Sequence, residues 1–538
     1  MIWIRQDGRH ALGCESVFHF ERAFEIYAQI KAPSPNYLTS LTKLIKYPWL
    51  LQVRQPAVSA IPSTYAAVFV FLSILFNLSF LNLAQLNIIY LALIILFTYL
   101  LGKSLSCSKT GLLSAFLIAF YPMVYGASRK LTPEIALTAI VVCAYYLLVK
   151  TNFFKSISYS IVLGITCLFG IMIHPLFAAF ISGGLLYCFF KIIKFTDKAK
   201  PQRFLNLITS ILIMLASLFF MHENFHKFNI VTKDTFKEMS ITLTKHSQTF
   251  IGNADTATDG LFLFASPEDS CPCTQTTSRG INLKCILFYL AQIPDQISFF
   301  CVFLLITSLF FFVKNKNCKG RVLLFLWAIF PYLILTLLPR KWGRFYMPAL
   351  PALALITACG ISSITDKRFK KILLVLILIV SFMQFFAYSY YALPGRPFLS
   401  ELTEFINTHK PFPSNYHFTV SQIMKQINNS NIPDQKQQTT AGLFDLVTSA
   451  DRFSSHWYND LTYYFRLLMN FYKRADINIA LNWDISTSII DNNSYDFLVV
   501  LSDDDYVFDD QIIKNYQLMQ KYTLKPSNII VITYKKKL

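Results

Sequence analysis

From residue 86 to residue 391 the chain alternates between apolar runs of 16 to 22 residues and short polar connections. A helix of that length crosses the hydrocarbon core of a bilayer, whereas membrane β-strands alternate polar and apolar residues over about ten positions. The pattern therefore predicts a polytopic α-helical membrane protein with about ten spans. We expect them near residues 86–103, 111–127, 133–149, 157–173, 175–190, 205–221, 298–313, 321–338, 345–363 and 371–391.

The connections between these runs differ in charge in an alternating way. Five of them carry 17 Lys and Arg residues but only two acidic residues, Asp197 and Asp366. Short loops rich in Lys and Arg mark the cytoplasmic side of a membrane protein. We therefore expect residues 1–85, the segment 222–297, the connection around Arg340 and everything after residue 391 on the opposite, extracytoplasmic side. The cations of the five loops are Lys103, Lys109, Lys150, Lys155, Lys191, Lys194, Lys198, Lys200, Arg203, Lys314, Lys316, Lys319, Arg321, Lys367, Arg368, Lys370 and Lys371.

The composition is typical of a membrane protein, and the distribution of charge argues against nucleic acid as a partner. Of the 538 residues, 54% are hydrophobic and 15% are charged, which is too apolar for an ordinary soluble enzyme. The formal net charge of +19 raises the question of nucleic-acid binding. Outside the five loops, however, 32 cations stand against 28 acids. The excess charge is thus an orientation signal, and we expect membrane lipids but no nucleic acid as partners.

The external segments divide into three parts. Residues 1–85 are expected to form a loop with interfacial helices, because "HFERAFEIYAQI" places Phe20, Phe24 and Tyr27 on one helical face. Within the core, 86–391, the external loop 222–297 contains "INLKCILFYLAQI", another candidate interfacial helix. Residues 392–538 are predicted to be a small α/β domain, in which strands in "YDFLVVLS" and "NIIVITYK" flank a helix in "DDQIIKNYQLMQKY".

The candidate chemistry lies on the external side. Guanidinium groups bind phosphate through paired hydrogen bonds, and a nearby carboxylate can take a proton from an incoming hydroxyl. Such groups together are typical of transfer from a lipid phosphate. The sequence offers Glu15 near its beginning, Arg129 and Lys130 followed by Glu134 in "YGASRKLTPEIAL", and Arg340, Lys341 and Arg344 in "LLPRKWGRFYMPALPALALI".

These motifs, in this order, resemble those of the C-type superfamily of membrane glycosyltransferases, which includes the protein O-mannosyltransferases and the lipid A aminoarabinose transferases. "ESVFHFERAFEIY" and "KYPWL" stand where that family has an acidic and aromatic element in its first external loop, which adds His19 and Tyr47 to the candidate substrate-binding residues. "RKLTPEIAL" and "KWGRFY" resemble the later elements of the family. Glu15 stands where the family usually has a catalytic aspartate, and "YPWL" lacks a second proline.

The resemblance implies an inverting transfer of a sugar from a polyprenyl-phosphate donor to a lipid, glycan or protein acceptor at the outer face of the plasma (inner) membrane. Glu15 would be the general base. Arg344 and Lys341, with Arg129, would bind the donor phosphate. Because Glu15 must share a side with Arg344, the resemblance also implies an external N-terminus and a missing upstream helix. The alternative from topology alone is that residues 57–81 span the membrane.

Other interpretations stay open. The external cations can anchor spans to lipid headgroups, and Glu15 can cap the helix that follows it. A transporter or flippase for lipid-linked saccharides would use the same cations to bind a headgroup, and a noncatalytic relative is a third alternative. His174, in "IMIHPLF", is interpreted as an interfacial histidine. No cofactor is expected, and a divalent metal has no support, because no histidine lies at zinc-like spacing beside the external cysteines.

Overall fold

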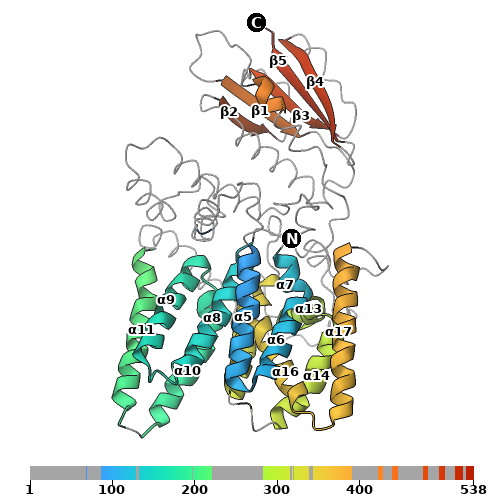
Figure 1. Ribbon diagram of the computed structural model, residues 1–538. Coiled ribbons are helices and arrows are strands. Elements are labelled where there is room, and N and C mark those ends of the chain that lie inside the picture. The colour runs from blue at the N-terminus through green and yellow to red at the C-terminus, as the bar shows by residue number, and fades with distance from the viewer. Residues whose placement is uncertain are drawn as a thin grey trace, which may run out of the picture. The chain divides into compact units, whose positions relative to one another are not determined.

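The computed structural model divides into two compact units. One contains the described helices between residues 87 and 390, and the other contains the described strands between residues 439 and 536 (Figure 1). Apart from residue 68, the structure describes residues 87–128, 132–196, 198–220, 283–314, 318, 320–338, 343–390, 422–427, 439–445, 477–482, 496–502, 515–524 and 529–537.

The first unit is a bundle of helices, and each of the ten predicted spans contains one. The helices are α5 (Asn87–Leu105), α6 (Ser108–Phe120), α7 (Pro122–Ala127), α8 (Pro133–Lys150), α9 (Ile157–Ile173), α10 (Phe177–Lys194), α11 (Lys200–Phe220), α13 (Leu283–Ile297), α14 (Phe299–Lys314), α15 (Arg321–Leu337), the 3-10 helix η3 (Gly343–Ala349), α16 (Leu350–Ser362) and α17 (Lys367–Tyr390).

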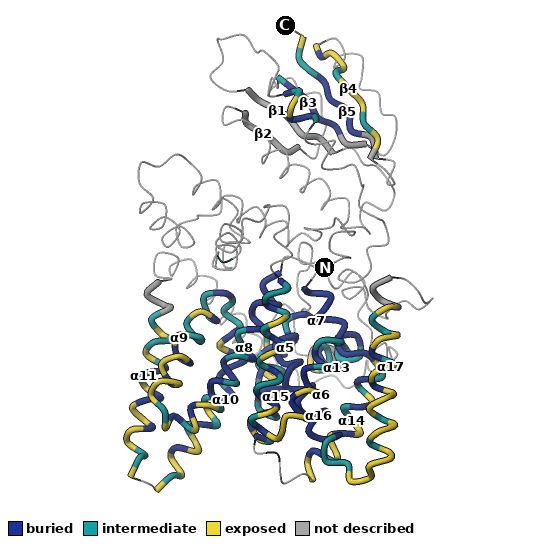
Figure 2. The backbone as a smooth tube through the Cα atoms, in the orientation of Figure 1, coloured by how far each residue is buried: buried dark blue, intermediate teal, exposed yellow. Residues whose placement is uncertain are grey.

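Five of these stretches are long and apolar enough to cross a membrane: α5, α8, α10, the continuous stretch Gly343–Ser362 and α17. Helices α13 and α14 add a sixth if the pair, which is bent by 112°, is counted as one span. Large apolar residues are exposed on these helices, with Ile372 67% and Phe303 64% exposed. Figure 2 shows the exposed positions along the helices of the bundle. Such a surface suits lipid rather than water. The prediction of a multi-pass helical membrane protein is confirmed.

Prolines interrupt two of the predicted spans. The run expected at 111–127 is divided between α6 and α7, because Tyr121 is extended, with φ −68° and ψ 122°, directly before Pro122. A residue that precedes proline is disfavoured in the helical region. The run expected at 345–363 begins as the 3-10 helix η3, which contains Pro348, and becomes α-helical only at Leu350.

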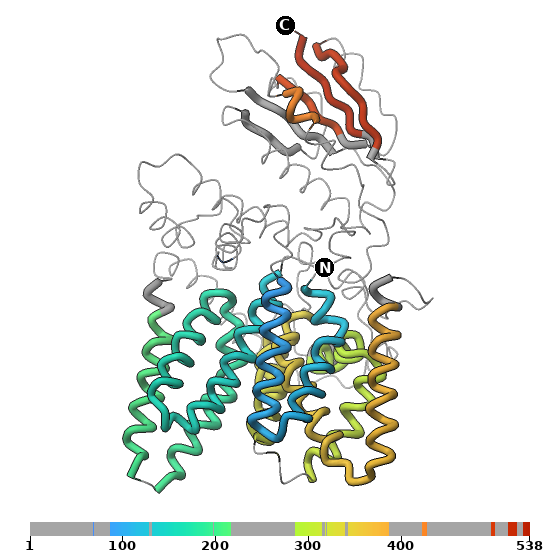
Figure 3. Tube along the Cα trace, viewed as in Figure 1, coloured from blue at the N-terminus to red at the C-terminus, as the bar shows by residue number. Residues whose placement is uncertain are grey.

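The lysine-rich loops lie together at one end of the bundle, as the alternation of charge predicts (Figure 3). Thr110 Oγ1 donates a hydrogen bond to Ser362 Oγ at 2.9 Å, and Lys370 Nζ donates to the carbonyl of Ser362 at 2.7 Å. These bonds join the α5–α6 connection to the α16–α17 connection. The opposite end of the bundle contains α7, the turn between α9 and α10, the end of α13, and η3.

The candidate helix in "INLKCILFYLAQI" is α13, which continues beyond that stretch through Pro294 to Ile297. Proline removes one backbone hydrogen bond inside a helix, and helices of membrane proteins tolerate this where neighbouring elements satisfy the freed group. The four additional residues place a polar segment, Asp295 and Gln296, inside the bundle.

The second unit contains a five-stranded sheet in the order β2-β1-β3-β5-β4. Strands β1 and β2 pair in parallel, as do β1 and β3, whereas β5 pairs antiparallel with both β3 and β4. The strands predicted in "YDFLVVLS" and "NIIVITYK" are confirmed as β3 and β5. The strands are β1 (Thr439–Asp445), β2 (Ile477–Asn482), β3 (Phe497–Ser502), β4 (Tyr516–Leu524) and β5 (Ile529–Lys536).

The helix predicted in "DDQIIKNYQLMQKY" is wrong over its second half. Residues 516–522 belong to β4, which pairs with β5 from Tyr516 opposite Lys536 to Leu524 opposite Ile529. The register shifts between Leu518 and Gln520, so the apolar residues of β4 do not alternate strictly and resemble a helical pattern. Pairing with β5 decides the conformation, as is common where local preference is weak.

Candidate active site

The 3-10 helix η3 is held in place by three hydrogen bonds with surrounding helices. Gln296 Nε2 of α13 donates to the carbonyl of Gly343 at 2.6 Å, and Trp327 Nε1 of α15 donates to the carbonyl of Pro348 at 3.1 Å. The hydroxyl of Tyr346 donates in turn to the carbonyl of Ala328 at 2.9 Å. Bonds at both ends of η3 fix the backbone on either side of Arg344.

Trp327 itself is fixed by packing. Its ring stacks on that of Tyr145 in α8, with ring centroids 4.0 Å apart and an interplanar angle of 7°. The Tyr145 hydroxyl donates to the carbonyl of Phe180 in α10 at 2.8 Å. Both rings are fully buried. This stack therefore joins α8, α10 and α15. The position of η3 depends on how these three helices pack.

Glu134 occupies the first turn of α8, directly after Pro133 at the first helical position. Proline is well suited to that position, and a carboxylate near a helix N-terminus is stabilised by the helix dipole. The Thr138 hydroxyl donates to the backbone carbonyl of Glu134 at 2.7 Å. The start of α8 thus presents a carboxylate at a defined place in the bundle.

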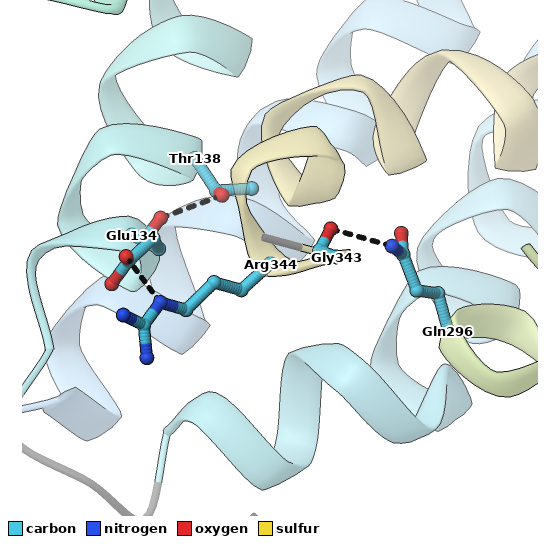
Figure 4. A network of polar contacts seen from close by, with 5 residues as sticks. All are labelled: Glu134, Thr138, Gln296, Gly343 and Arg344. Atoms are coloured by element: carbon cyan, nitrogen blue, oxygen red, sulfur yellow. Dashed lines mark hydrogen bonds and ion pairs between the residues drawn. The ribbon is translucent and has the colours of Figure 1, made fainter. Parts of the chain in front are cut away.

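Arg344 and Glu134 form a buried ion pair (Figure 4). Arg344 Nε lies 3.0 Å from Glu134 Oε1, and the two residues are only 6% and 2% exposed. Two charges taken out of water are costly unless they are paired, so each residue depends on the other as its partner. The motifs "RKLTPEIAL" and "KWGRFY", far apart in the sequence, therefore meet in one place.

His174, in the turn between α9 and α10, belongs to the same site. Its Nδ1 accepts a hydrogen bond from the backbone N–H of Leu176 at 3.1 Å, and its ring lies beside that of Phe345, with centroids 6.2 Å apart. Burial lowers the pKa of His174, with Arg344 acting in the same direction and Glu134 in the opposite one. An imidazole that accepts at Nδ1 and has a lowered pKa is neutral at pH 7, with its proton on Nε2.

Two of the eight residues predicted from the sequence, Glu134 and Arg344, are thus brought into contact. The other six lie outside the described residues, and their roles stay predictions: Glu15, His19, Tyr47, Arg129, Lys130 and Lys341. The sequence reasoning missed Gln296, which orients η3, although a polar residue at the end of an apolar helix was a signal for it. In the part of the chain that the structure describes, no group of three or more His, Cys, Asp or Glu residues is placed to hold a metal ion.

The fold was compared with those of solved structures. ArnT from Cupriavidus metallidurans bound to undecaprenyl phosphate matches with a TM-score of 0.56 and 12% sequence identity, over 98% of this chain and 94% of that chain. Its apo state matches with a TM-score of 0.55 and 11% identity, over the same shares of the two chains. The chain has the fold of the C-type membrane glycosyltransferases.

At this level of identity the likeness extends to the C-type fold and not to the chemistry of individual residues. No family model matches the sequence, and the comparison with curated proteins found no match. The C-type fold confirms the resemblance seen in the sequence motifs. Function has to be argued from the site itself.

Proposed function

We propose that the protein is an inverting glycosyltransferase that moves a hexosyl or pentosyl unit from a polyprenyl phosphate to a hydroxyl or amine acceptor. The observation that carries this proposal is the buried Arg344, held by Glu134 at the end of the bundle opposite the lysine-rich loops. A buried guanidinium in a membrane protein is costly and is retained where it binds an anion or lines a substrate path. The C-type fold, found in an ArnT structure that contains undecaprenyl phosphate, agrees with a lipid phosphate as that anion.

The distribution of charged loops indicates the side of the membrane on which the reaction takes place. The lysine-rich loops mark the cytoplasmic side, so the Arg344 end belongs to the outer face of the plasma membrane, together with the external domain 392–538. The acceptor would be a lipid, a glycan or a protein on that face. A nucleotide-linked donor is not expected there.

In the reaction we propose, Glu15 takes the proton of the acceptor group as the acceptor attacks the anomeric carbon of the sugar. The bond between that carbon and the phosphate oxygen breaks, and polyprenyl phosphate leaves on the opposite face. Arg344, with Lys341, Arg129 and Lys130, would neutralise the charge that develops on the phosphate. His19 and Tyr47 would complete the donor site.

Glu134 has a separate part in this proposal. A carboxylate oxygen at 3.0 Å from Nε orients the guanidinium of Arg344 (Figure 4). Glu134 would therefore be a positioning residue that compensates the buried charge of Arg344 and orients its guanidinium when no donor is bound.

The test uses the full-length protein in lipid vesicles with radiolabelled undecaprenyl-phosphate hexoses and pentoses, and with lipid, glycan and protein fractions of a cell envelope as acceptors. The label should pass to one acceptor fraction and release undecaprenyl phosphate. Glu15→Gln keeps the shape of the side chain but removes the base, so transfer should fall by about 100-fold or more while donor binding survives.

A flippase is the alternative that this experiment separates. It would move the labelled lipid between leaflets without breaking the bond to the sugar. Labelled lipid that changes leaflet with its sugar still attached, and no labelled acceptor, would favour the flippase. Transfer by the Glu15→Gln variant at the parent rate would instead remove Glu15 from the role of general base.

A further inference from the structure

Helix α13 has its polar side inside the bundle and its apolar side outside. Ile286 and Leu290 are 41% and 49% exposed, whereas the buried positions are Tyr289, Gln292, Asp295, Gln296 and Ile297. A helix on the surface of a soluble protein shows the opposite arrangement. Ionisable residues in membrane proteins face the interior of the bundle and mark substrate or ion pathways. The buried side of α13 is therefore a candidate binding surface.

Asp295 is the unexplained group on this surface. It is only 6% exposed, and within the described part of the chain its Oδ2 has no hydrogen-bond partner. A buried carboxyl without a hydrogen bond is unfavourable by several kcal/mol in an apolar setting. The proposed mechanism does not use it, since Glu15 is the base and Arg344 is paired with Glu134. Something that donates hydrogen bonds is needed at Oδ2.

The position of Asp295 relates it to the phosphate site. The next residue, Gln296, bonds the carbonyl of Gly343, which directly precedes Arg344. Gln292 lies one helical turn before Asp295 and is also buried. Ser298, at φ 81°, then breaks the helix, and the chain turns by 112° into α14. The carboxyl and the amides are thus held on a rigid element that adjoins η3.

Aromatic rings extend the same surface. The ring of Tyr289 lies 6.0 Å from that of Tyr346 in η3 and 6.5 Å from that of Tyr332 in α15, measured between centroids. A carboxylate accepts hydrogen bonds only, and a primary amide both donates and accepts. Neighbouring sugar hydroxyls, each a donor and an acceptor, match that set, and aromatic side chains commonly line such sites.

We propose that the buried side of α13 binds the sugar of the lipid-linked donor, with Asp295 accepting hydrogen bonds from its hydroxyl groups and Gln292 supporting them. This inference rests on the proposed function, because it places the sugar next to the phosphate that Arg344 binds. It assigns the two parts of the donor to different helices. Arg344 on η3 binds the phosphate, which all polyprenyl-phosphate donors share. The buried side of α13 distinguishes one sugar from another.

The test compares two probes on the full-length protein in nanodiscs: undecaprenyl phosphate without a sugar, and the undecaprenyl-phosphate hexose or pentose that the parent binds more tightly. Asp295→Asn keeps the size of the side chain but weakens its hydrogen bonds. Binding of the sugar-bearing lipid should weaken by about 10- to 100-fold, and binding of bare undecaprenyl phosphate should change by less than about twofold. Gln292→Leu should show the same selective loss to a smaller extent.

The matched control is Asp366→Asn, at the lysine-rich end of the same bundle, where Asp366 Oδ1 accepts from the backbone N–H groups of Arg368 and Phe369. Binding of both probes should be unchanged in that variant. Equal weakening of both probes by Asp295→Asn would show that Asp295 bonds another part of the chain, and unchanged binding of both would also overturn the sugar site. A parent that binds the sugar selectively but transfers none would refute the transferase and leave the sugar site standing.

Discussion

The two ends of the helix bundle both carry cations, but they hold them in different ways. At the lysine-rich end, Lys103, Lys150 and Lys314 are exposed and lie in or next to loops. At the other end, Arg344 is buried and paired with Glu134. Exposed cations orient a membrane protein through their number, whereas a buried one acts through its position. The two roles differ in whether the cation is buried and paired with a specific partner, more than in the charge itself.

Arg203 sharpens the comparison, because it is a buried cation at the lysine-rich end. Its Nη1 donates to the carbonyls of Asn152 and Phe153 at 2.7 and 3.2 Å. Asn152, Phe153 and Phe154 all have positive φ, at 50°, 54° and 62°, which is unfavourable for residues other than glycine. Arg203 thus stabilises a strained turn through backbone carbonyls. Arg344 instead has a carboxylate partner, Glu134.

The largest expected effect comes from breaking the buried ion pair. Arg344→Ala leaves the carboxylate of Glu134 buried without its partner, so the protein should lose about 3 to 5 kcal/mol of stability. Thermal unfolding in detergent, monitored by circular dichroism, measures the loss. Transfer should be abolished, and Arg344→Lys should recover little of it because an ammonium group cannot replace the guanidinium geometry.

The double variant Arg344→Met with Glu134→Gln separates stability from binding. With both charges removed, most of the lost stability should return, but transfer should stay absent. A double variant as unstable as Arg344→Ala would argue against the pair as the source of the effect. A double variant that transfers sugar would remove Arg344 from the donor site.

The next effect is expected at the other end of the bundle. Arg203→Ala removes charged hydrogen bonds to the strained turn, and it should cost about 1.5 to 3 kcal/mol in the same unfolding measurement. Donor binding per folded molecule should stay at the parent level, because the turn lies at the end opposite η3. Selective loss of donor binding in this variant would contradict the separation of the two ends.

The smallest effect is expected for exposed cations. Lys150→Gln and Lys314→Gln should each change stability by no more than about 0.5 kcal/mol, since exposed side chains away from buried contacts contribute little. Both side chains lie near aromatic rings, Lys150 Nζ at 5.5 Å from the Tyr146 centroid and Lys314 Nζ at 3.9 Å from that of Phe310. A loss of stability above about 1 kcal/mol would mean that these lysines stabilise the fold through their ring contacts, in addition to orienting the protein in the membrane.

The sequence predicted the helical positions well because bilayer thickness sets the length of an apolar run. It also predicted that Glu134 and Arg344 belong to one site, from their place at the ends of spans. It could not predict their direct contact, which depends on how α8 and η3 pack against Trp327. Asp295 was not among the predicted residues, because its burial depends on how α13 packs in the bundle, and β4 was missed because its pairing with β5 is a tertiary effect.

The ion pair also has a consequence for the time at which the site forms. Glu134 begins α8, whereas Arg344 follows α15, so the carboxylate enters the membrane well before its partner has been synthesised. Until then Glu134 has no cationic partner, and an unpaired carboxylate in hydrocarbon is unfavourable, so the start of α8 is expected to stay near the headgroups. The arrival of η3 gives Glu134 its partner and brings Arg344 to the place where we propose that the phosphate binds. A chain whose later helices fail to insert would therefore keep an unpaired acid at the start of α8.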